Sequence, residues 1–320
     1  MEGLYAGQLN ITGWGTQPLQ MMVNMVLEVY MKQKIQAEII KYFPEKIKNE
    51  INRLNIENFE EIRLRVLKPV IIKEHDRETI LTIDGQAYIL SKEELNKIFE
   101  MICSNSIYAF QEELANGFIT IPGGHRIGIT GKPLYKEGRI YSMKDISSLN
   151  IRIARQIVGC ADNIIEKILE DNVLIVALPG LGKTTLLRDI IRQISNKGKN
   201  VGIVDERSEI AAVYKGISQN DVGIRSDVID GVYKVDGIKM LVRSMKPDYI
   251  ATDEIGNDDD IEAIKYAINA GVKIIATAHG GSLDDLKRRK KLYELIENKI
   301  FEKIIFINKN REILIHNLNA

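Results

Sequence analysis

The chain of 320 residues contains few cysteines, few aromatic residues and no excess of charge of either sign. Its two cysteines, Cys103 and Cys160, lie far apart and lack the spacing of a metal-binding pair, so we interpret them as buried thiols in a reducing cytosol. Lys and Arg together number 44, as do Asp and Glu, and the net charge is therefore zero. This balance excludes a general basic field that would hold nucleic acid or an anionic membrane without specificity.

The sequence also lacks a hydrophobic run long enough to cross a bilayer. Residues 21–31 come nearest, but the run is too short and is interrupted by Asn24 and Glu28. It has neither the basic start nor the small-residue cleavage site of a signal peptide. Residues 1–30 are rich in Gly, Gln and Asn, whereas Lys, Glu and Ile dominate afterwards. Two interpretations stay open for them: a genuine extension, or upstream sequence that takes no part in the fold.

The composition that remains is sufficient for two domains with real cores, at 45% apolar and 28% charged residues. Residues 31–158 mix helical and strand patterns. Asp84-Gly85 between two short strand patterns predicts a hairpin, and Ser91 followed by Glu94 predicts a capping box at the start of a helix. We therefore expect a smaller α+β domain over residues 31–158, without a nucleotide signature.

From residue 159 onwards the pattern changes to short apolar strands that alternate with helices. The expected strands are residues 173–177, 201–204, 249–252 and 273–277. They show no alternation, which is typical of a parallel sheet covered on both faces. Residues 303–316 predict two further strands joined at Lys309-Asn310, an antiparallel hairpin at the sheet edge. The fold class expected for residues 159–320 is therefore α/β.

The stretch ALPGLGKTT, residues 177–185, follows the first of these strands and resembles a phosphate-binding loop. Such a loop needs a tight turn into a helix, inward N–H groups and a Lys for the β and γ phosphates. Gly182 allows close backbone approach, Lys183 supplies the charge, and the Thr184 hydroxyl supplies a Mg²⁺ ligand. The residues that we expect to bind the nucleotide are Ala177, Leu178, Pro179, Gly180, Leu181, Gly182, Lys183, Thr184 and Thr185. Most such loops begin with Gly in place of Ala177, which leaves the nucleotide affinity open; a Gly-rich turn without a ligand is the alternative.

Hydrolysis needs more than a binding loop, and polar residues follow three other expected strands. Asp253 can complete the Mg²⁺ shell and Glu254 can polarise the attacking water. Asp205 and Glu206 form a second acidic pair, and His279 ends a further strand, where it can sense the γ phosphate. The Asp253-Glu254 pair also implies that another strand is inserted between strand 173–177, which precedes the phosphate loop, and strand 249–252. Residues 201–204 are available as that inserted strand. These signals together predict a working site.

Several blocks of the sequence resemble the stage III sporulation protein AA family. They are DERSEIAA, GIRSDVIDG, LVRSMKPDYIATDEIG and TAHGGS, with GGHRIGITG and SLNIRIAR upstream. The resemblance covers residues 31–320 and implies a RecA-like P-loop ATPase related to type II and type IV secretion ATPases. It matches Asp205-Glu206 to their acidic box and His279 to their histidine box. The family's loop generally reads Gly-Pro-Pro-Gly where this chain has Ala-Leu-Pro-Gly.

The resemblance also implies how the protein works. ATPases of this type form hexameric rings on the cytoplasmic face of a membrane complex, here the mother-cell side of a channel into the forespore. We therefore expect ATP and Mg²⁺ as ligands, a homo-hexamer, and membrane proteins of the sporulation channel complex as partners. We expect no nucleic acid partner, and a cytoplasmic location that is peripheral to a membrane through those partners.

In such a ring an arginine from the neighbouring subunit can neutralise charge in the transition state. The candidates are Arg225, Arg243, Arg126, Arg152 and Arg155. Arg152 can equally lie on the outer face of a strand. The residues that we expect to act in catalysis are Glu254, Glu206, His279, Arg225 and Arg243.

Two other functions stay open. A nucleic-acid motor of the RecA or helicase type predicts a basic channel with stacking aromatic residues, against which the 6% aromatic content and zero net charge argue. A non-hydrolysing, nucleotide-gated scaffold predicts binding without turnover, with Ala177 as a sign of decay. The presence of Lys183, Asp253 and Glu254 argues against such decay.

Overall fold

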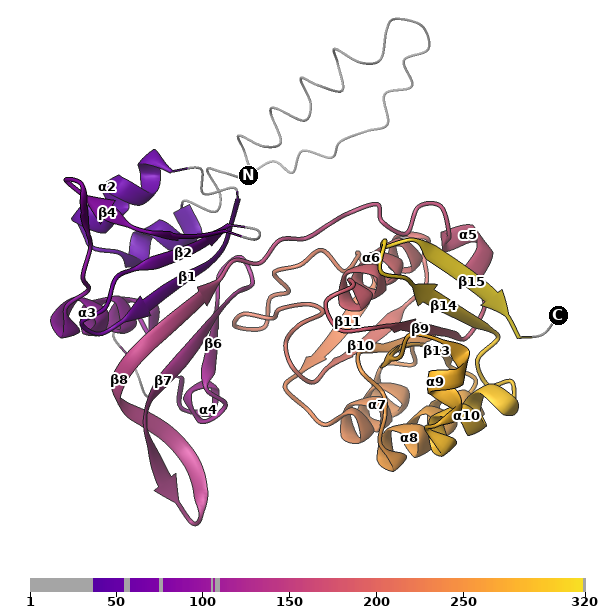
Figure 1. Ribbon diagram of the computed structural model, residues 1–320. Helices are drawn as coiled ribbons and strands as arrows, with labels where there is room; N and C mark the ends of the chain where they lie inside the picture. Colours follow the sequence, from indigo (N-terminus) through magenta and orange to yellow (C-terminus); the bar gives the residue numbers. More distant parts are fainter. Residues whose placement is uncertain (1–36, 55–57, 75–76, 105, 107–109, 319–320) are drawn as a thin grey trace, which may run out of the picture. The chain divides into compact units, whose positions relative to one another are not determined.

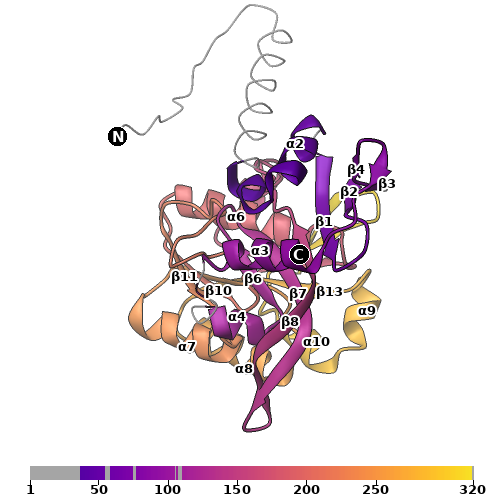
Figure 2. The ribbon, with the colours of Figure 1, turned by 90° about the vertical axis from the view of Figure 1, so that its left-hand side faces the viewer.

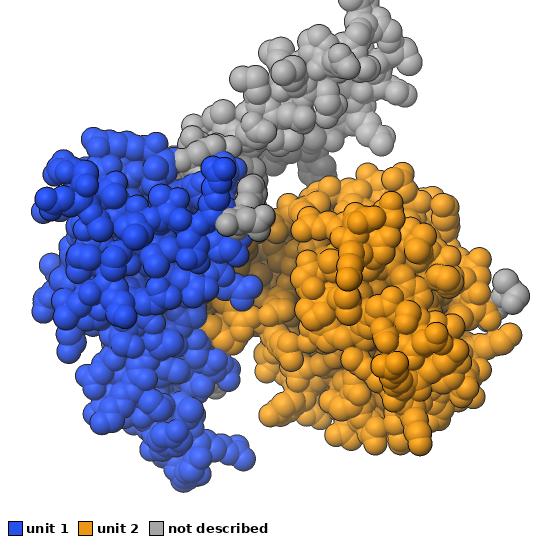
Figure 3. Space-filling view, viewed as in Figure 1, with its two compact units in different colours: residues 1–117, 128–152 blue, residues 118–127, 153–320 orange. Residues whose placement is uncertain are grey.

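The structure is a computed structural model that describes residues 37–54, 58–74, 77–104, 106 and 110–318. The expected extension, residues 1–30, lies outside these ranges. The chain divides into two compact units, one of residues 1–117 and 128–152 and the other of residues 118–127 and 153–320 (Figure 3). The sequence pattern predicts a single boundary, after residue 158. Within the described ranges, no helix combines the length and the apolar character needed to cross a bilayer.

A six-stranded sheet has the order β3-β2-β1-β8-β7-β6, in which β1 pairs antiparallel with both β2 and β8 (Figure 1). Its strands are β1 Phe59–Arg65, β2 Ile71–Glu74, β3 Arg77–Ile80, β6 Phe118–Ile121, β7 His125–Lys136 and β8 Arg139–Arg152. The helical segments of the first unit are η1 Ile40–Tyr42, α2 Glu45–Arg53, α3 Lys92–Ile102 and α4 Gln111–Ala115.

Two local predictions in the first unit are confirmed. At the start of α3, the Ser91 hydroxyl accepts from the Glu94 N–H at 3.1 Å, and the Glu94 carboxylate accepts from the Ser91 N–H at 2.9 Å, which is the capping box. Asp84 and Gly85 join β4 (Thr82–Ile83) to β5 (Gln86–Ala87), and both have positive φ, 52° and 77°. Two central residues with positive φ are the mark of a type I′ hairpin turn.

The second unit is built on a seven-stranded sheet of order β11-β10-β12-β13-β9-β14-β15. Its strands are β9 Val173–Ala177, β10 Val201–Asp205, β11 Ser226–Asp230, β12 Tyr249–Thr252, β13 Lys273–His279, β14 Lys303–Ile307 and β15 Ile313–Asn317. Its helices are α5 Ile165–Ile168, α6 Lys183–Asn196, α7 Lys234–Ser244, α8 Asp258–Asn269, α9 Leu283–Lys287 and α10 Lys290–Glu297. All strand pairs are parallel except β14–β15, so the predicted α/β class and C-terminal antiparallel hairpin are confirmed.

The strands β9, β10, β12 and β13 show no alternation in burial because helices cover both faces of the sheet. Figures 1 and 2 show α6 on one face and α7, α8 and α10 on the other. In β9, Ile175 packs with the side chains of α6, whereas Leu174 and Val176 pack with those of α7, α8 and α10. Every residue of β9 is therefore buried, and burial of each large apolar side chain contributes about 1.5–3 kcal/mol. This buried sheet positions the polar residues at its carboxyl edge.

The place of one strand differs from the sequence-based expectation. A strand is indeed inserted between β9 and β12, but it is β13, and β10 lies on the far side of β12. The assignment of residues 201–204 to the inserted place was therefore wrong. Both β10 and β13 are short apolar runs, and the sequence of such a run does not indicate which strands lie beside it. The crossover helices and the packing of the two faces set the strand order.

Candidate nucleotide site

The phosphate loop, residues 177–185, turns from β9 into α6. Gly180 and Gly182 have φ of +77° and +95°, a region that glycine adopts without strain. A Cβ added at either position meets nothing within 4 Å, so backbone conformation alone requires glycine there. Gly182 is the N-cap of α6, and its carbonyl accepts from the Leu186 N–H at 2.9 Å. The free N–H groups of the first turn of α6 are therefore available to an anion.

Ala177 belongs to the strand rather than to the turn. It is 1% exposed and pairs with His279 of β13 on one side and Ile307 of β14 on the other. Its methyl group lies in the apolar cluster beneath α6. The glycine found here in most phosphate loops is thus not required by the conformation of this chain.

Lys183 folds back over the loop. Its Nζ donates to the carbonyls of Ala177 and Leu178 at 3.1 and 3.3 Å, and lies 3.1 Å from Nδ1 of His279. Burial lowers the pKa of Lys183, while the nearby carboxylates of Asp253 and Glu254 act in the opposite direction. All three acceptors of the ammonium are neutral groups, and a phosphate is a stronger acceptor because it is charged.

Asp253 lies beside the phosphate loop. Its Oδ2 accepts from the Thr184 hydroxyl at 2.5 Å, and its Oδ1 accepts from the Thr277 hydroxyl. The Thr277 oxygen in turn accepts from the Glu254 N–H at 2.9 Å. The oxygens of Thr184 and Asp253 are hard ligands in contact with each other, and such a pair suits a Mg²⁺ ion that shares its remaining sites with phosphate and water.

Glu254 is held at both carboxylate oxygens. Oε1 lies 3.0 Å from Nε2 of His279, and Oε2 accepts from Nη1 of Arg207 at 2.7 Å. Because the ammonium of Lys183 can only donate, Nδ1 of His279 accepts and Nε2 carries the proton directed at Glu254. The φ of Glu254 is +53°, a conformation that is uncommon outside glycine and concentrates at functional sites.

The second acidic pair separates into two roles. Asp205 is 2% exposed, and its carboxylate accepts the N–H groups of Glu209, Ile210 and Ala211 at 2.8, 3.0 and 2.8 Å. Burial raises the pKa of Asp205, against the effect of these hydrogen bonds. Glu206 instead pairs with Lys234, the first residue of α7. Asp205 thus shapes the loop after β10. A single cavity is lined by Asp205, Glu206, Arg207, Glu209, Lys234, Asp253 and Glu254.

Arg225 and Arg243 lie away from the phosphate loop of their own chain. The Arg225 carbonyl accepts from the N–H of Val201, the first residue of β10, which places Arg225 at the amino edge of the sheet. Arg243 lies in the last turn of α7, the helix that leads back to the start of β12 at the same edge. Both side chains are exposed, so neither joins Glu254 within one chain.

The other candidate arginines have local partners. Nη1 of Arg126 lies 2.8 Å from the Glu209 carboxylate, and its guanidinium lies 3.6 Å from the centre of the Phe118 ring. Arg152, in the first unit, lies 4.0 Å from Glu61. Arg155 belongs to the second unit.

Sequence reasoning missed Arg207 and Lys234. Arg207 stands directly after Asp205-Glu206, and its place behind an acidic pair at a strand end was a usable signal. Lys234 opens a helix in an ordinary surface pattern and offered none.

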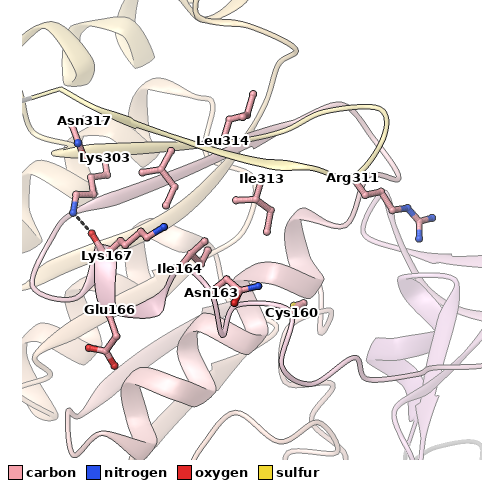
Figure 4. A pocket seen from close by; sticks show the side chains of 11 residues that line it. Cys160, Asn163, Ile164, Glu166, Lys167, Lys303, Arg311, Ile313, Leu314 and Asn317 are labelled. Carbon is pink, nitrogen blue, oxygen red and sulfur yellow. Dashed lines mark hydrogen bonds between the residues drawn. The ribbon is translucent and has the colours of Figure 1, made fainter. Parts of the chain in front are cut away.

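A second hollow, of about 980 Å³, lies where α5 faces the C-terminal hairpin (Figure 4). It is lined by Ile164, Ile313 and Leu314 together with Lys167 and Arg311. No residue predicted to bind nucleotide lines it, so the phosphate loop and the large hollow are separate features.

The glycine turn that leads to Lys183, with carboxylates at the ends of neighbouring parallel strands, defines the second unit as a RecA-like P-loop NTPase domain. The X-ray structure of the ATPase DotB from Legionella pneumophila is similar, with a TM-score of 0.57 and 19% identity over 85% of this chain and 79% of that chain. The crystal structure of the pilus retraction motor PilT with bound ADP gives a TM-score of 0.56 and 17% identity, over 87% and 81%. The fold of this chain is therefore similar to the folds of DotB and PilT.

The chain belongs to the family described as sporulation stage III, protein AA, whose model matches residues 32–314. Stage III sporulation protein AA from Bacillus subtilis (strain 168) is 38% identical over 283 residues, which are 85% of this chain and 91% of that protein. The resemblance inferred from the sequence blocks is thus confirmed.

Proposed function

We propose that the protein is a Mg²⁺-dependent ATPase that binds ATP on the phosphate loop. The observation that carries the proposal is the 2.5 Å contact between Thr184 and Asp253, and Glu254 is the next residue in the chain. Residues far apart in the sequence thus form one arrangement suited to phosphoryl transfer. The fold shared with DotB, an ATPase by name, and with PilT, which was crystallised with ADP, supports the same activity.

Each residue has a defined part in the proposed reaction. Lys183 exchanges the carbonyls of Ala177 and Leu178 for the β and γ phosphates. Thr184 and Asp253 would hold Mg²⁺, which would neutralise charge on the phosphate oxygens. Glu254 orients a water molecule and accepts its proton. The water oxygen bonds to the γ phosphorus as the bond to the bridging oxygen breaks, and ADP leaves with the electron pair of that bond. Glu206 and His279 support this arrangement.

We further propose that the protein acts as a homo-hexamer that energises a secretion-like membrane channel complex during endospore formation, from mother cell to forespore. Family membership and the fold shared with DotB and PilT support this role. Arg225 and Arg243 are exposed and remote from the phosphate loop of their own chain, which favours action on a neighbouring subunit. Membrane proteins of the channel complex are the partners.

The test is ATP hydrolysis with Mg²⁺ over a series of protein concentrations, for the wild type, Glu254→Gln and the control Glu297→Gln. Glu297 ends α10 and is exposed. We expect specific activity to rise with concentration, to fall about 10²–10⁴-fold in Glu254→Gln, and to stay unchanged in the control. ATP binding without turnover would favour the nucleotide-gated scaffold, and stimulation by nucleic acid would favour the motor.

A further inference from the structure

The contact between Arg207 and Glu254 conflicts with the role of Glu254 as the residue that orients water. Its Oε2 accepts from Arg207 at 2.7 Å while Oε1 faces His279 at 3.0 Å. A carboxylate with a charged donor on one oxygen and a second donor on the other is a weak acceptor for water, because its negative charge is already stabilised. Glu254 becomes a stronger acceptor for water when one of these contacts opens.

The contact to Arg207 is the one that opens more easily. The Arg207 side chain is 62% exposed and that of Glu254 is 28% exposed. Ion pairs this close to solvent are weak and are screened by salt. His279, in contrast, is held from its other side by Lys183.

The base of the Arg207 side chain is fixed, so a change of partner needs only side-chain rotation. Asp205, two residues before Arg207, accepts hydrogen bonds from N–H groups that follow Arg207 in the loop. Ser208, the residue after Arg207, donates its hydroxyl proton to Asp230 of β11 at 2.8 Å. The Arg207 side chain therefore extends from a hydrogen-bonded loop and lines the cavity that also contains Asp253 and Glu254.

The other acids of this cavity already have partners. Glu206 pairs with Lys234, and Glu209 pairs with Arg126. A phosphate group that arrives at Lys183 and Asp253 is a multiply charged acceptor, and the planar guanidinium matches its oxygens with two parallel hydrogen bonds. Such a phosphate competes directly with Glu254 for Arg207.

On the basis of the proposed ATPase function, we propose that Arg207 has two alternating partners within one subunit. It binds Glu254 and restrains it, and it moves to the γ phosphate when ATP is bound. The move frees Glu254 to orient water and brings a positive charge to the transferred group. Arg207 is then a phosphate-contacting arginine in cis, which couples arrival of the substrate to release of the base.

The first test measures binding, so that it does not depend on turnover. The affinities for ADP and for the β,γ-imido analogue of ATP are compared by calorimetry in the wild type, Arg207→Ala, Arg207→Lys and the control Lys199→Ala. Lys199 pairs with Glu170 directly before β10, at the opposite edge of the sheet. We expect Arg207→Ala to lower the affinity for the ATP analogue about tenfold and the affinity for ADP less than about twofold. We expect an intermediate loss in Arg207→Lys and no change in the control.

If Arg207→Ala lowered the affinities for both nucleotides equally, or lowered neither, the proposal for Arg207 would be overturned. A wild type that binds neither nucleotide would overturn the proposed function and this inference together. A wild type that binds both without hydrolysing them would remove only the proposed hydrolysis, since the ratio of affinities still decides the role of Arg207.

The second test separates action within a subunit from action on a neighbour. Arg207→Ala and Glu254→Gln chains are mixed in equal amounts, and ATP turnover is compared with that of each variant alone. Because each chain lacks one of the two groups, action in cis predicts no recovery. Recovery of turnover would mean that Arg207 serves the neighbouring site, against the proposal.

Discussion

Two Asp-Glu pairs lie at the ends of neighbouring strands of the same sheet, and their aspartates accept hydrogen bonds from different kinds of donor. Asp205, at the end of β10, accepts three backbone N–H groups and is 2% exposed. Asp253, after β12, accepts hydroxyl groups from the phosphate-loop helix and from β13. The first arrangement stabilises a loop, and the second presents oxygens beside a phosphate loop. An identical dipeptide therefore acquires its role from the strand beside it.

The largest difference between the pairs is expected in stability. Asp205→Ala leaves three backbone N–H groups, two of them buried, without their acceptor. We expect the free energy of unfolding to fall by about 3–5 kcal/mol. Glu254→Gln should change it by less than about 0.5 kcal/mol. Urea unfolding of both variants measures the contrast.

Asp205→Asn is the matched control for this prediction. The amide oxygen still accepts from the N–H groups of Ile210 and Ala211, whereas the amide nitrogen cannot accept from that of Glu209. Loss of the charge removes the cost of burying a carboxylate, which raises the pKa of Asp205. We expect it to lose less than half as much stability as Asp205→Ala. Equal losses in Asp205→Ala and Glu254→Gln would show that the two pairs are not distinguished by the backbone contacts.

The second prediction concerns pH. Asp230 pairs in register with Asp205, and loss of hydration at this corner, with the adjacent carboxylate, raises the pKa of Asp230 from 3.8 to about 6, although the Ser208 hydroxyl opposes the shift. Between these values the folded chain binds more protons at this site than the unfolded chain, so the stabilising contribution falls as pH rises from about 4 to about 6. Asp230→Asn should remove that fall.

Melting temperatures at intervals between pH 4 and pH 7 test this second prediction. The control is Asp259→Asn, since Asp259 is exposed at the start of α8. Its curve should follow that of the wild type, whereas the Asp230→Asn curve should be flatter. Parallel curves for all three proteins would contradict the predicted titration.

The smallest effects are expected at Ala177. Because this residue lies in β9 and not in the turn, Ala177→Gly should change the ATP affinity by less than about threefold and lower the stability by about 0.5–1 kcal/mol. Calorimetry with the ATP analogue and urea unfolding measure the two quantities. A tenfold gain in affinity would instead show that the methyl group tunes the phosphate loop.

Local features of this fold follow from the sequence alone. The capping box at Ser91, the hairpin at Asp84-Gly85 and the glycines before Lys183 depend on dihedral preferences and hydrogen bonds between near neighbours. The α/β class follows from apolar runs that do not alternate. These properties are set within a few residues, so a pattern is sufficient to predict them.

Only the tertiary structure decided which strand lies beside which. It placed β13 next to β9, brought His279 to Lys183, and separated Arg225 and Arg243 from the loop of their own chain. It also placed the guanidinium of Arg207 against the carboxylate of Glu254. Strand order depends on the packing of whole helices against both faces of the sheet, and apolar strands of similar length are interchangeable in any local pattern. Roles that depend on neighbours in space were therefore beyond the reach of the sequence.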